Sequence, residues 1–118
     1  EVYWLSKIIN AESGGEILKG KIAVGNVILN RVRSPYFPNT IYSVIFDKKN
    51  GVQFSPVANG NIYKNANSDS VIAAKICLEG YSVDNNILYF VNPKVAPNSW
   101  VGKNRPFYAQ IGNHAFFY

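Results

Sequence analysis

The chain has 118 residues, a length typical of one domain, and 47% of them are hydrophobic, which is enough for a packed core and argues against disorder. The net charge of +5, from 12 basic and 7 acidic residues, favours a polyanionic partner, although the basic residues are scattered. No apolar stretch approaches the roughly 20 residues of a membrane-spanning helix, and no signal-peptide pattern begins the chain, so we expect no membrane insertion and any targeting segment to lie outside this sequence.

The first helix is predicted over 2–11. Leu5 and Ile8 begin an apolar stripe at helical spacing, which Ile9 continues. The glycine pair 14–15 is expected to end this helix.

The second helix is predicted to be the buried centre of the fold. Ser13 and Glu16 have the spacing of a capping box, which predicts the start of the helix at this point. From 22 to 32 the sequence is apolar nearly all round, and Pro35 is expected to end the helix.

The middle of the chain predicts two further helices separated by irregular structure. A short helix is expected to be capped by Asn39 or Thr40. The stretch 47–67 is polar and irregular, and a longer helix is then expected to begin at Asn67 or Ser68.

The last third predicts strands. Residues 87–91 form a β-rich run, and 92–106 read as a loop with three prolines. The stretches 108–111 and 114–117 flank Gly112-Asn113, a two-residue hairpin signal. Helices followed by a small antiparallel sheet predict an α+β domain.

A single cysteine and a single histidine limit the metal and covalent chemistry. Cys77 lies in an apolar run, which predicts a buried small side chain more than a nucleophile paired with His114. One cysteine and one histidine cannot complete a structural zinc site. No loop has the pattern of an EF-hand. We therefore expect no metal and no cofactor.

Among the acidic residues, Glu12 is the one without an evident structural role. It continues the apolar stripe of the first helix, where burial raises the pKa of a carboxyl. Its place in the last turn raises the pKa further, because the C-terminal end of a helix disfavours an anion. A carboxyl that stays protonated near neutral pH can serve as a general acid. The alternative is a partly buried glutamate bonded to a backbone amide or to Arg31.

Eight aromatic residues lie between positions 89 and 118. Phe90 and Phe116 alternate on strands and are expected in the core. Trp100 and Tyr108 lie beside proline- and glycine-rich loop and suit a groove that stacks on sugar rings. The same features suit single-stranded nucleic acid, on whose bases aromatic side chains also stack.

At this point the sequence resembles the SleB/CwlJ-type cell wall hydrolases, the spore cortex-lytic enzymes of endospore-forming bacteria. The matching blocks cover almost the whole chain in order. They are residues 9–16 (INAESGGE), 20–32 (GKIAVGNVILNRV), 37–41 (FPNTI), 53–55 (QFS), 88–90 (LYF), 92–93 (NP), Trp100 and 111–116 (IGNHAF). One departure is that Gly14 or Gly15 stands where the family usually has an arginine.

The resemblance implies a lysozyme-like α+β fold, with residues 1–118 as a single catalytic domain and a groove for cortex peptidoglycan. It implies that Glu12 is the catalytic glutamate. Family members of this kind act as lytic transglycosylases or muramidase-like enzymes on the bond between muramic acid, or muramic-δ-lactam, and N-acetylglucosamine. We accordingly expect an extracytoplasmic monomer that acts on the spore cortex or cell wall during germination, with peptidoglycan and not nucleic acid as its partner.

A single-carboxylate mechanism fits this sequence better than a pair, because the capping role expected of Glu16 points it at backbone amides. Closure of a 1,6-anhydro ring on the muramoyl residue consumes no water and needs no second base. The candidate substrate-binding residues are polar or aromatic side chains of the matching blocks: Glu16, Asn30, Gln53, Phe54, Ser55, Tyr89, Phe90, Asn92, Trp100 and His114. A wall-binding module without catalysis and a nucleic-acid-binding domain are the competing hypotheses.

Overall fold

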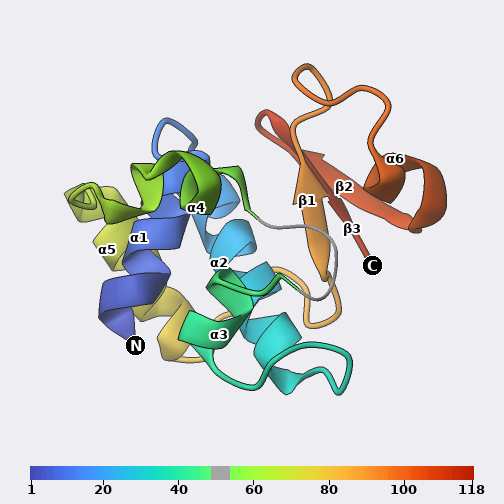
Figure 1. Ribbon diagram of the computed structural model, residues 1–118. Helices are drawn as coiled ribbons and strands as arrows, with labels where there is room; N and C mark the ends of the chain where they lie inside the picture. Colours follow the sequence, from blue (N-terminus) through green and yellow to red (C-terminus); the bar gives the residue numbers. More distant parts are fainter. Residues whose placement is uncertain (49–53) are drawn as a thin grey trace.

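The computed structural model describes residues 1–48 and 54–118, and it places a group of helices beside a small sheet (Figure 1). The predicted α+β class is confirmed. In chain order the elements are α1 (Val2–Ser13), α2 (Leu18–Arg33), α3 (Ile41–Ile45), α4 (Ser55–Asn59), the 3-10 helix η1 (Asn61–Tyr63), α5 (Ser68–Leu78), β1 (Tyr89–Val91), α6 (Trp100–Asn104), β2 (Phe107–Ile111) and β3 (His114–Phe117). In the described part of the chain, no helix is both long and apolar enough to cross a membrane.

The core lies where α1, α2 and α5 pack against one another. Helix α2 is buried from Gly20 through Ile28, as its apolar sequence predicts. Gly25 lets α5 approach closely, because a Cβ at this position would lie 2.7 Å from Cys77 Sγ and 3.0 Å from Ile9 Cδ1. Cys77 is buried, as predicted, and burial raises the pKa of its thiol to about 12. The thiol is therefore a packing group rather than a nucleophile.

The predicted capping box between Ser13 and Glu16 is wrong. Ser13 belongs to α1, and its hydroxyl donates to the carbonyl of Ile9 at 2.6 Å. Helix α2 begins after Ile17 without a side-chain cap. The Glu16 carboxylate instead binds the distant Asn113, a partner that local spacing does not reveal.

The caps predicted for the two later helices are confirmed. Thr40 Oγ1 accepts a hydrogen bond from the backbone of Ser43 at the start of α3. Asn67 Oδ1 accepts one from the backbone of Ser70 at the start of α5. The stretch 47–67 is less irregular than expected, since its described part contains α4 and η1.

Two asparagines of α2 attach the segment that leads from α5 into the sheet. Asn26 accepts from the backbone of Val83 at 2.7 Å and donates to a carbonyl of Tyr81 at 3.1 Å. Asn30 donates to the carbonyls of Asp84 and Ile87. These bonds satisfy the buried polar side chains of Asn26 and Asn30 and direct the chain towards β1.

The sheet has the strand order β1-β3-β2, with both pairs antiparallel. The predicted hairpin is confirmed, and it turns at Gly112-Asn113, where Gly112 adopts a φ of +58°. The predicted loop over 92–106 contains one helical turn that the sequence analysis missed. That turn is α6, and Ser99 caps it by accepting from the backbone of Gly102.

Replacing Gly25 with alanine tests the close packing of α2 on α5. We expect G25A to lower the free energy of unfolding by about 1–3 kcal/mol, because the new methyl group overlaps Cys77 and Ile9. Chemical denaturation measures this change. The matched control is G15A, since a Cβ at Gly15 meets nothing within 4 Å. Equal stability of the two variants would contradict the packing described here.

Candidate active site

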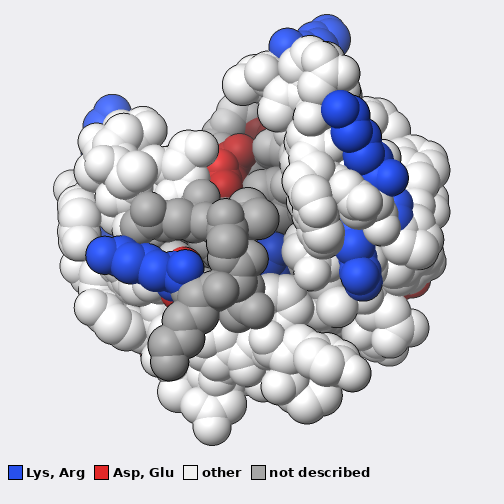
Figure 2. Space-filling model, turned by 45° about the vertical axis from the view of Figure 1, so that its right-hand side comes forward, with Lys and Arg blue, Asp and Glu red and all other residues white. Residues whose placement is uncertain are grey.

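A groove of about 480 Å³ lies between the helices and the sheet. Figure 2 shows a hollow between these two parts of the molecule, with acidic atoms inside it. The groove receives side chains from α1, α2, the start of α4, β1, the segment between β1 and β2, and the start of β3. They are Glu12, Arg31, Phe54, Ser55, Tyr89, Phe90, Val91, Asn92, Val95, Ala96, Ser99, Trp100, Val101 and His114.

Glu12 is the one carboxylate among these lining residues. Burial raises the pKa of its carboxyl from 4.5 to about 7. A shift of this size corresponds to about 3 kcal/mol of disfavoured ionisation. Within the described residues the carboxyl has no hydrogen bond and no ion pair, so the alternative in which it is bonded to a backbone amide or to Arg31 is not what this structure contains. The arrangement suits a carboxyl that gives up a proton near neutral pH.

Glu16 connects the loop after α1 to the tip of the hairpin. Its two carboxylate oxygens accept from the backbone N–H and the side-chain amide of Asn113, each at 3.0 Å. These bonds lower the pKa of the Glu16 carboxyl. A Cβ at Gly112 would overlap Glu16 Oε1, so a larger residue there would displace this carboxylate. We call this contact the Glu16–Asn113 clamp; it fixes the start of β3, which carries His114.

Arg31 lies at the groove with its guanidinium surrounded by aromatic rings. The guanidinium carbon is 4.7 Å from the ring centre of Phe37, 5.0 Å from that of Phe54 and 5.2 Å from that of Tyr89. Its Nε donates to the carbonyl of Leu88 at 2.8 Å. Burial lowers the pKa of Arg31 to about 10, which leaves the side chain charged at neutral pH.

The aromatic side of the groove combines buried and exposed rings. Phe54 stacks on Phe90 at 5.8 Å between ring centres. Tyr89 meets Trp100 edge to face at 6.4 Å, and Trp100 is 56% exposed. A half-exposed indole that lines a groove suits stacking on a sugar ring.

His114 lies at the start of β3, buried but on the groove. Its Nδ1 is buried without a hydrogen-bond partner in the part of the chain that the structure describes. Burial lowers the pKa of the imidazole, and the nearby Glu16 partly opposes this shift. The ring is therefore neutral at pH 7, with one nitrogen able to donate and the other able to accept.

The groove brings together most of the residues that the sequence analysis proposed for the site. Glu12, Phe54, Ser55, Tyr89, Phe90, Asn92, Trp100 and His114 all line it. Glu16 and Asn30 do not: the first holds the hairpin, and the second holds the segment before β1. Gln53 lies outside the described residues. Tyr108, which was also considered for the groove, packs against Tyr118.

Sequence reasoning missed Arg31 as a groove residue and considered it only as a partner of Glu12. Arg31 is the one charged residue within the run 22–32 of α2, and this was the signal that could have singled it out.

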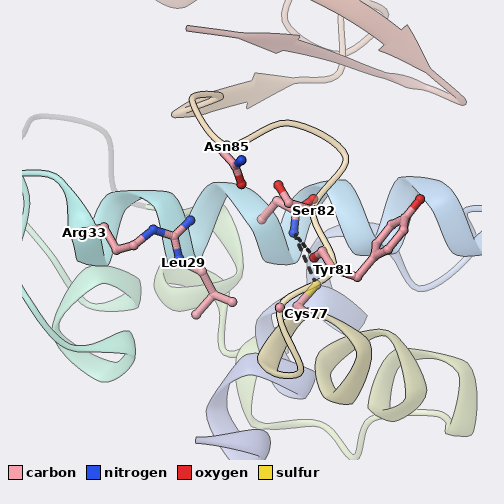
Figure 3. A pocket seen from close by; sticks show the side chains of 8 residues that line it. Leu29, Arg33, Cys77, Tyr81, Ser82 and Asn85 are labelled. Atoms are coloured by element: carbon pink, nitrogen blue, oxygen red, sulfur yellow. Dashed lines mark hydrogen bonds between the residues drawn. The ribbon is translucent and has the colours of Figure 1, made fainter.

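A second, smaller hollow of about 160 Å³ lies on another part of α2, beside the segment after α5 (Figure 3). No carboxylate is among its described lining residues. Those labelled in the figure are Leu29, Arg33, Cys77, Tyr81, Ser82 and Asn85. The unreactive Cys77 thiol offers no nucleophile. Within 1–48 and 54–118, no three His, Cys, Asp or Glu side chains gather to hold a metal ion. The groove at Glu12 is therefore the candidate active site.

Comparison with known proteins places the chain in a family. The sequence profile of the family described as Cell Wall Hydrolase matches residues 15–117. The chain belongs to this family. It is 37% identical to a spore cortex-lytic enzyme of Bacillus cereus and 34% identical to that of Bacillus subtilis, in each case over 98% of the chain. The chain spans 43% and 37% of the length of these two relatives.

Two solved structures resemble this member of the cell wall hydrolase family along its whole length. One is the catalytic domain of the germination-specific lytic transglycosylase SleB from Bacillus anthracis, with a TM-score of 0.87, 37% identity, and coverage of 99% of this chain and 93% of that one. The other is the catalytic domain of the Bacillus cereus SleB protein, with a TM-score of 0.86, 37% identity, and coverage of 99% and 88%. These matches confirm the predicted lysozyme-like α+β fold.

Replacing Glu16 with alanine tests the Glu16–Asn113 clamp. Because hydrogen bonds lower the pKa of Glu16, the clamp stabilises the fold above the ordinary pKa of 4.5 and loses its contribution as the pH falls through the lowered value. We expect E16A to lower the free energy of unfolding by about 1 kcal/mol at pH 7. Urea denaturation at several pH values measures this loss.

The difference between wild type and E16A should shrink at a pH well below 4.5. The control is E16Q, which keeps an acceptor oxygen but no charge, and whose stability should not carry this pH dependence. If E16A lowered the free energy of unfolding by the same amount at acid and neutral pH, the result would contradict the clamp.

Proposed function

We propose that residues 1–118 form a catalytic domain that cleaves the glycan strands of peptidoglycan as a lytic transglycosylase. The bond cleaved is the one between muramic acid and N-acetylglucosamine. The observation that carries the proposal is that Glu12 is the one carboxylate among the described residues that line the groove, and that its pKa of about 7 lets it donate a proton at neutral pH. Membership of the cell wall hydrolase family supports the same substrate class.

In the first step, the Glu12 carboxyl protonates the glycosidic oxygen, and the bond from that oxygen to C1 of the muramoyl residue breaks. The electron pair of the bond leaves with N-acetylglucosamine, which departs with a free 4-hydroxyl group. The muramoyl ring is left with oxocarbenium character. A buried carboxyl is suited to this step because it is a strong enough acid to donate and is still protonated beforehand.

In the second step, the carboxylate left on Glu12 takes the proton of the muramoyl 6-hydroxyl as its oxygen bonds to C1. The product is a 1,6-anhydromuramoyl end, and Glu12 regains its proton. The lining residues supply no second carboxylate to activate water, because Glu16 is engaged with Asn113. A two-carboxylate hydrolysis requires separations of about 5–9.5 Å between the two groups. The single carboxylate therefore favours transglycosylation.

The substrate is proposed to lie along the aromatic side of the groove, with a sugar ring against Trp100. The segment between β1 and β2 contributes Lys94, Lys103 and Arg105, and Figure 2 shows basic side chains on this side of the hollow. Basic groups at the rim attract a polyanionic wall. We infer an extracytoplasmic site of action on the spore cortex or cell wall.

The test is mass spectrometry of the muropeptides released from spore cortex by wild type and by Glu12→Gln. Wild type is expected to release fragments with anhydromuramoyl ends, and E12Q none, because an amide cannot donate the proton. Reducing muramic acid ends from wild type would contradict transglycosylation and favour hydrolysis. An intact glycan with both proteins would contradict the enzyme and favour a wall-binding module.

Thermal unfolding of E12Q separates a catalytic defect from a folding defect. The folded state binds the Glu12 proton more tightly than the unfolded state, so this group favours folding least at high pH. Glutamine removes that dependence. E12Q should therefore be at least as stable as wild type above pH 7, as is common when a buried functional charge is removed.

A further inference from the structure

The guanidinium of Arg31 is a buried cation that makes one hydrogen bond to the residues that the structure describes. Arg31 is 4% exposed, and it lines the groove together with Glu12. A guanidinium offers five N–H donors. Only the Nε donor has a hydrogen-bond partner among the described residues, the carbonyl of Leu88. Buried charges in proteins are usually paired, because an unpaired one loses its hydration without compensation.

A purely structural role explains one of these donors. The bond from Nε to Leu88 joins α2 to the residue before β1 and helps place the strand. The rings of Phe37, Phe54 and Tyr89 hold the guanidinium from its sides. These contacts fix the orientation of the group and attract its charge through the ring faces, but among the described residues no oxygen acceptor receives the N–H donors at its far end.

The Glu12 carboxyl does not accept hydrogen bonds from these donors either. The raised pKa of Glu12 has burial as its cause, with no contribution from a nearby cation. Asp47 acts on Arg31 through its charge and favours the charged form of the guanidinium. The positive charge is thus kept apart from the carboxyl that must stay protonated.

We propose that Arg31 is a specificity-determining residue that binds an acyl oxygen of the glycan strand, and this inference rests on the proposed function. The terminal N–H groups donate to a carbonyl or carboxylate oxygen carried by a sugar in the groove. A guanidinium presents its donors as a planar fork, which matches such oxygens better than single hydroxyl groups. The surrounding rings exclude water and strengthen the bond.

Peptidoglycan offers this chemistry from two sources. One is the N-acetyl carbonyl, which both sugars of the strand carry. The other is the lactyl group of the muramoyl residue, as a peptide-linked carbonyl, a lactam or a free carboxylate. Binding experiments with two probes separate them, because oligomers of N-acetylglucosamine contain the first group and lack the second.

The experiment measures the affinity of E12Q, which binds without turnover, and of E12Q/R31K for two probes. The probes are N-acetylglucosamine tetramer and a tetrasaccharide of alternating N-acetylglucosamine and N-acetylmuramic acid. Lysine keeps the charge but removes the fork. If R31K weakens the binding of both probes by about tenfold or more, the N-acetyl carbonyl is the group that Arg31 binds. If it weakens the binding of the muramoyl probe alone, the lactyl group is that group. Equal affinities of both proteins for both probes would overturn the proposal.

The matched control is Arg33→Lys in the same E12Q background. Arg33 lies one half-turn away on the same helix, bonds to Asn30 and lines the second hollow instead of the groove. R33K should leave both affinities unchanged. A loss of the same size in R33K would assign the effect to the helix and not to Arg31.

A spectroscopic readout keeps the test independent of how well R31K folds. In E12Q with Arg31 intact, addition of the bound probe should shift the NMR signals of the Arg31 terminal N–H groups and slow their exchange with water. Unchanged signals at saturation would overturn the proposal. If E12Q binds neither probe and wild type does not cleave cortex, the proposed function fails instead.

Discussion

The site depends on the burial of one carboxyl at the end of a packed helix. Helix α1 packs against α2 and α5 through a fully buried stripe that includes Leu5 and Ile8, so its rotation is fixed. Glu12 continues that stripe and lines the groove, where its side chain is half-buried. The loss of hydration raises its pKa to about 7. The same packing that stabilises the fold therefore prepares the proton donor.

The opposite side of the groove is held by polar contacts that begin in the helical part of the molecule. Asn26 and Asn30 attach the segment before the sheet, and Arg31 bonds to the residue that precedes β1. The Glu16–Asn113 clamp fixes the hairpin tip. The two glutamates of the block 9–16 thus have separate roles. Glu12 has no hydrogen-bond partner among the described residues, whereas both carboxylate oxygens of Glu16 accept hydrogen bonds from Asn113.

Much of the fold follows from the sequence because its signals are local. The apolar stripe of α1, the caps at Thr40 and Asn67, and the hairpin turn at Gly112 depend on residues within a few positions of one another. The same stripe singled out Glu12. The role of Glu16 was not predictable, since a capping box is a local pattern whereas its partner Asn113 lies 97 positions away. The role of Asn30 likewise depends on long-range hydrogen bonds, to the carbonyls of Asp84 and Ile87.

The central claim is that Glu12 is protonated at neutral pH in the folded protein, and a titration of its side-chain carboxyl by carbon-13 NMR tests it most directly. Selective labelling of glutamate, with E12Q to assign the signal, follows this carboxyl alone. The account predicts a midpoint near 7, well above that of Glu16, whose pKa is lowered by its hydrogen bonds to Asn113. A midpoint close to the ordinary value of 4.5 would mean that the carboxyl is hydrated and ionised at neutral pH, and would contradict its role as the acid.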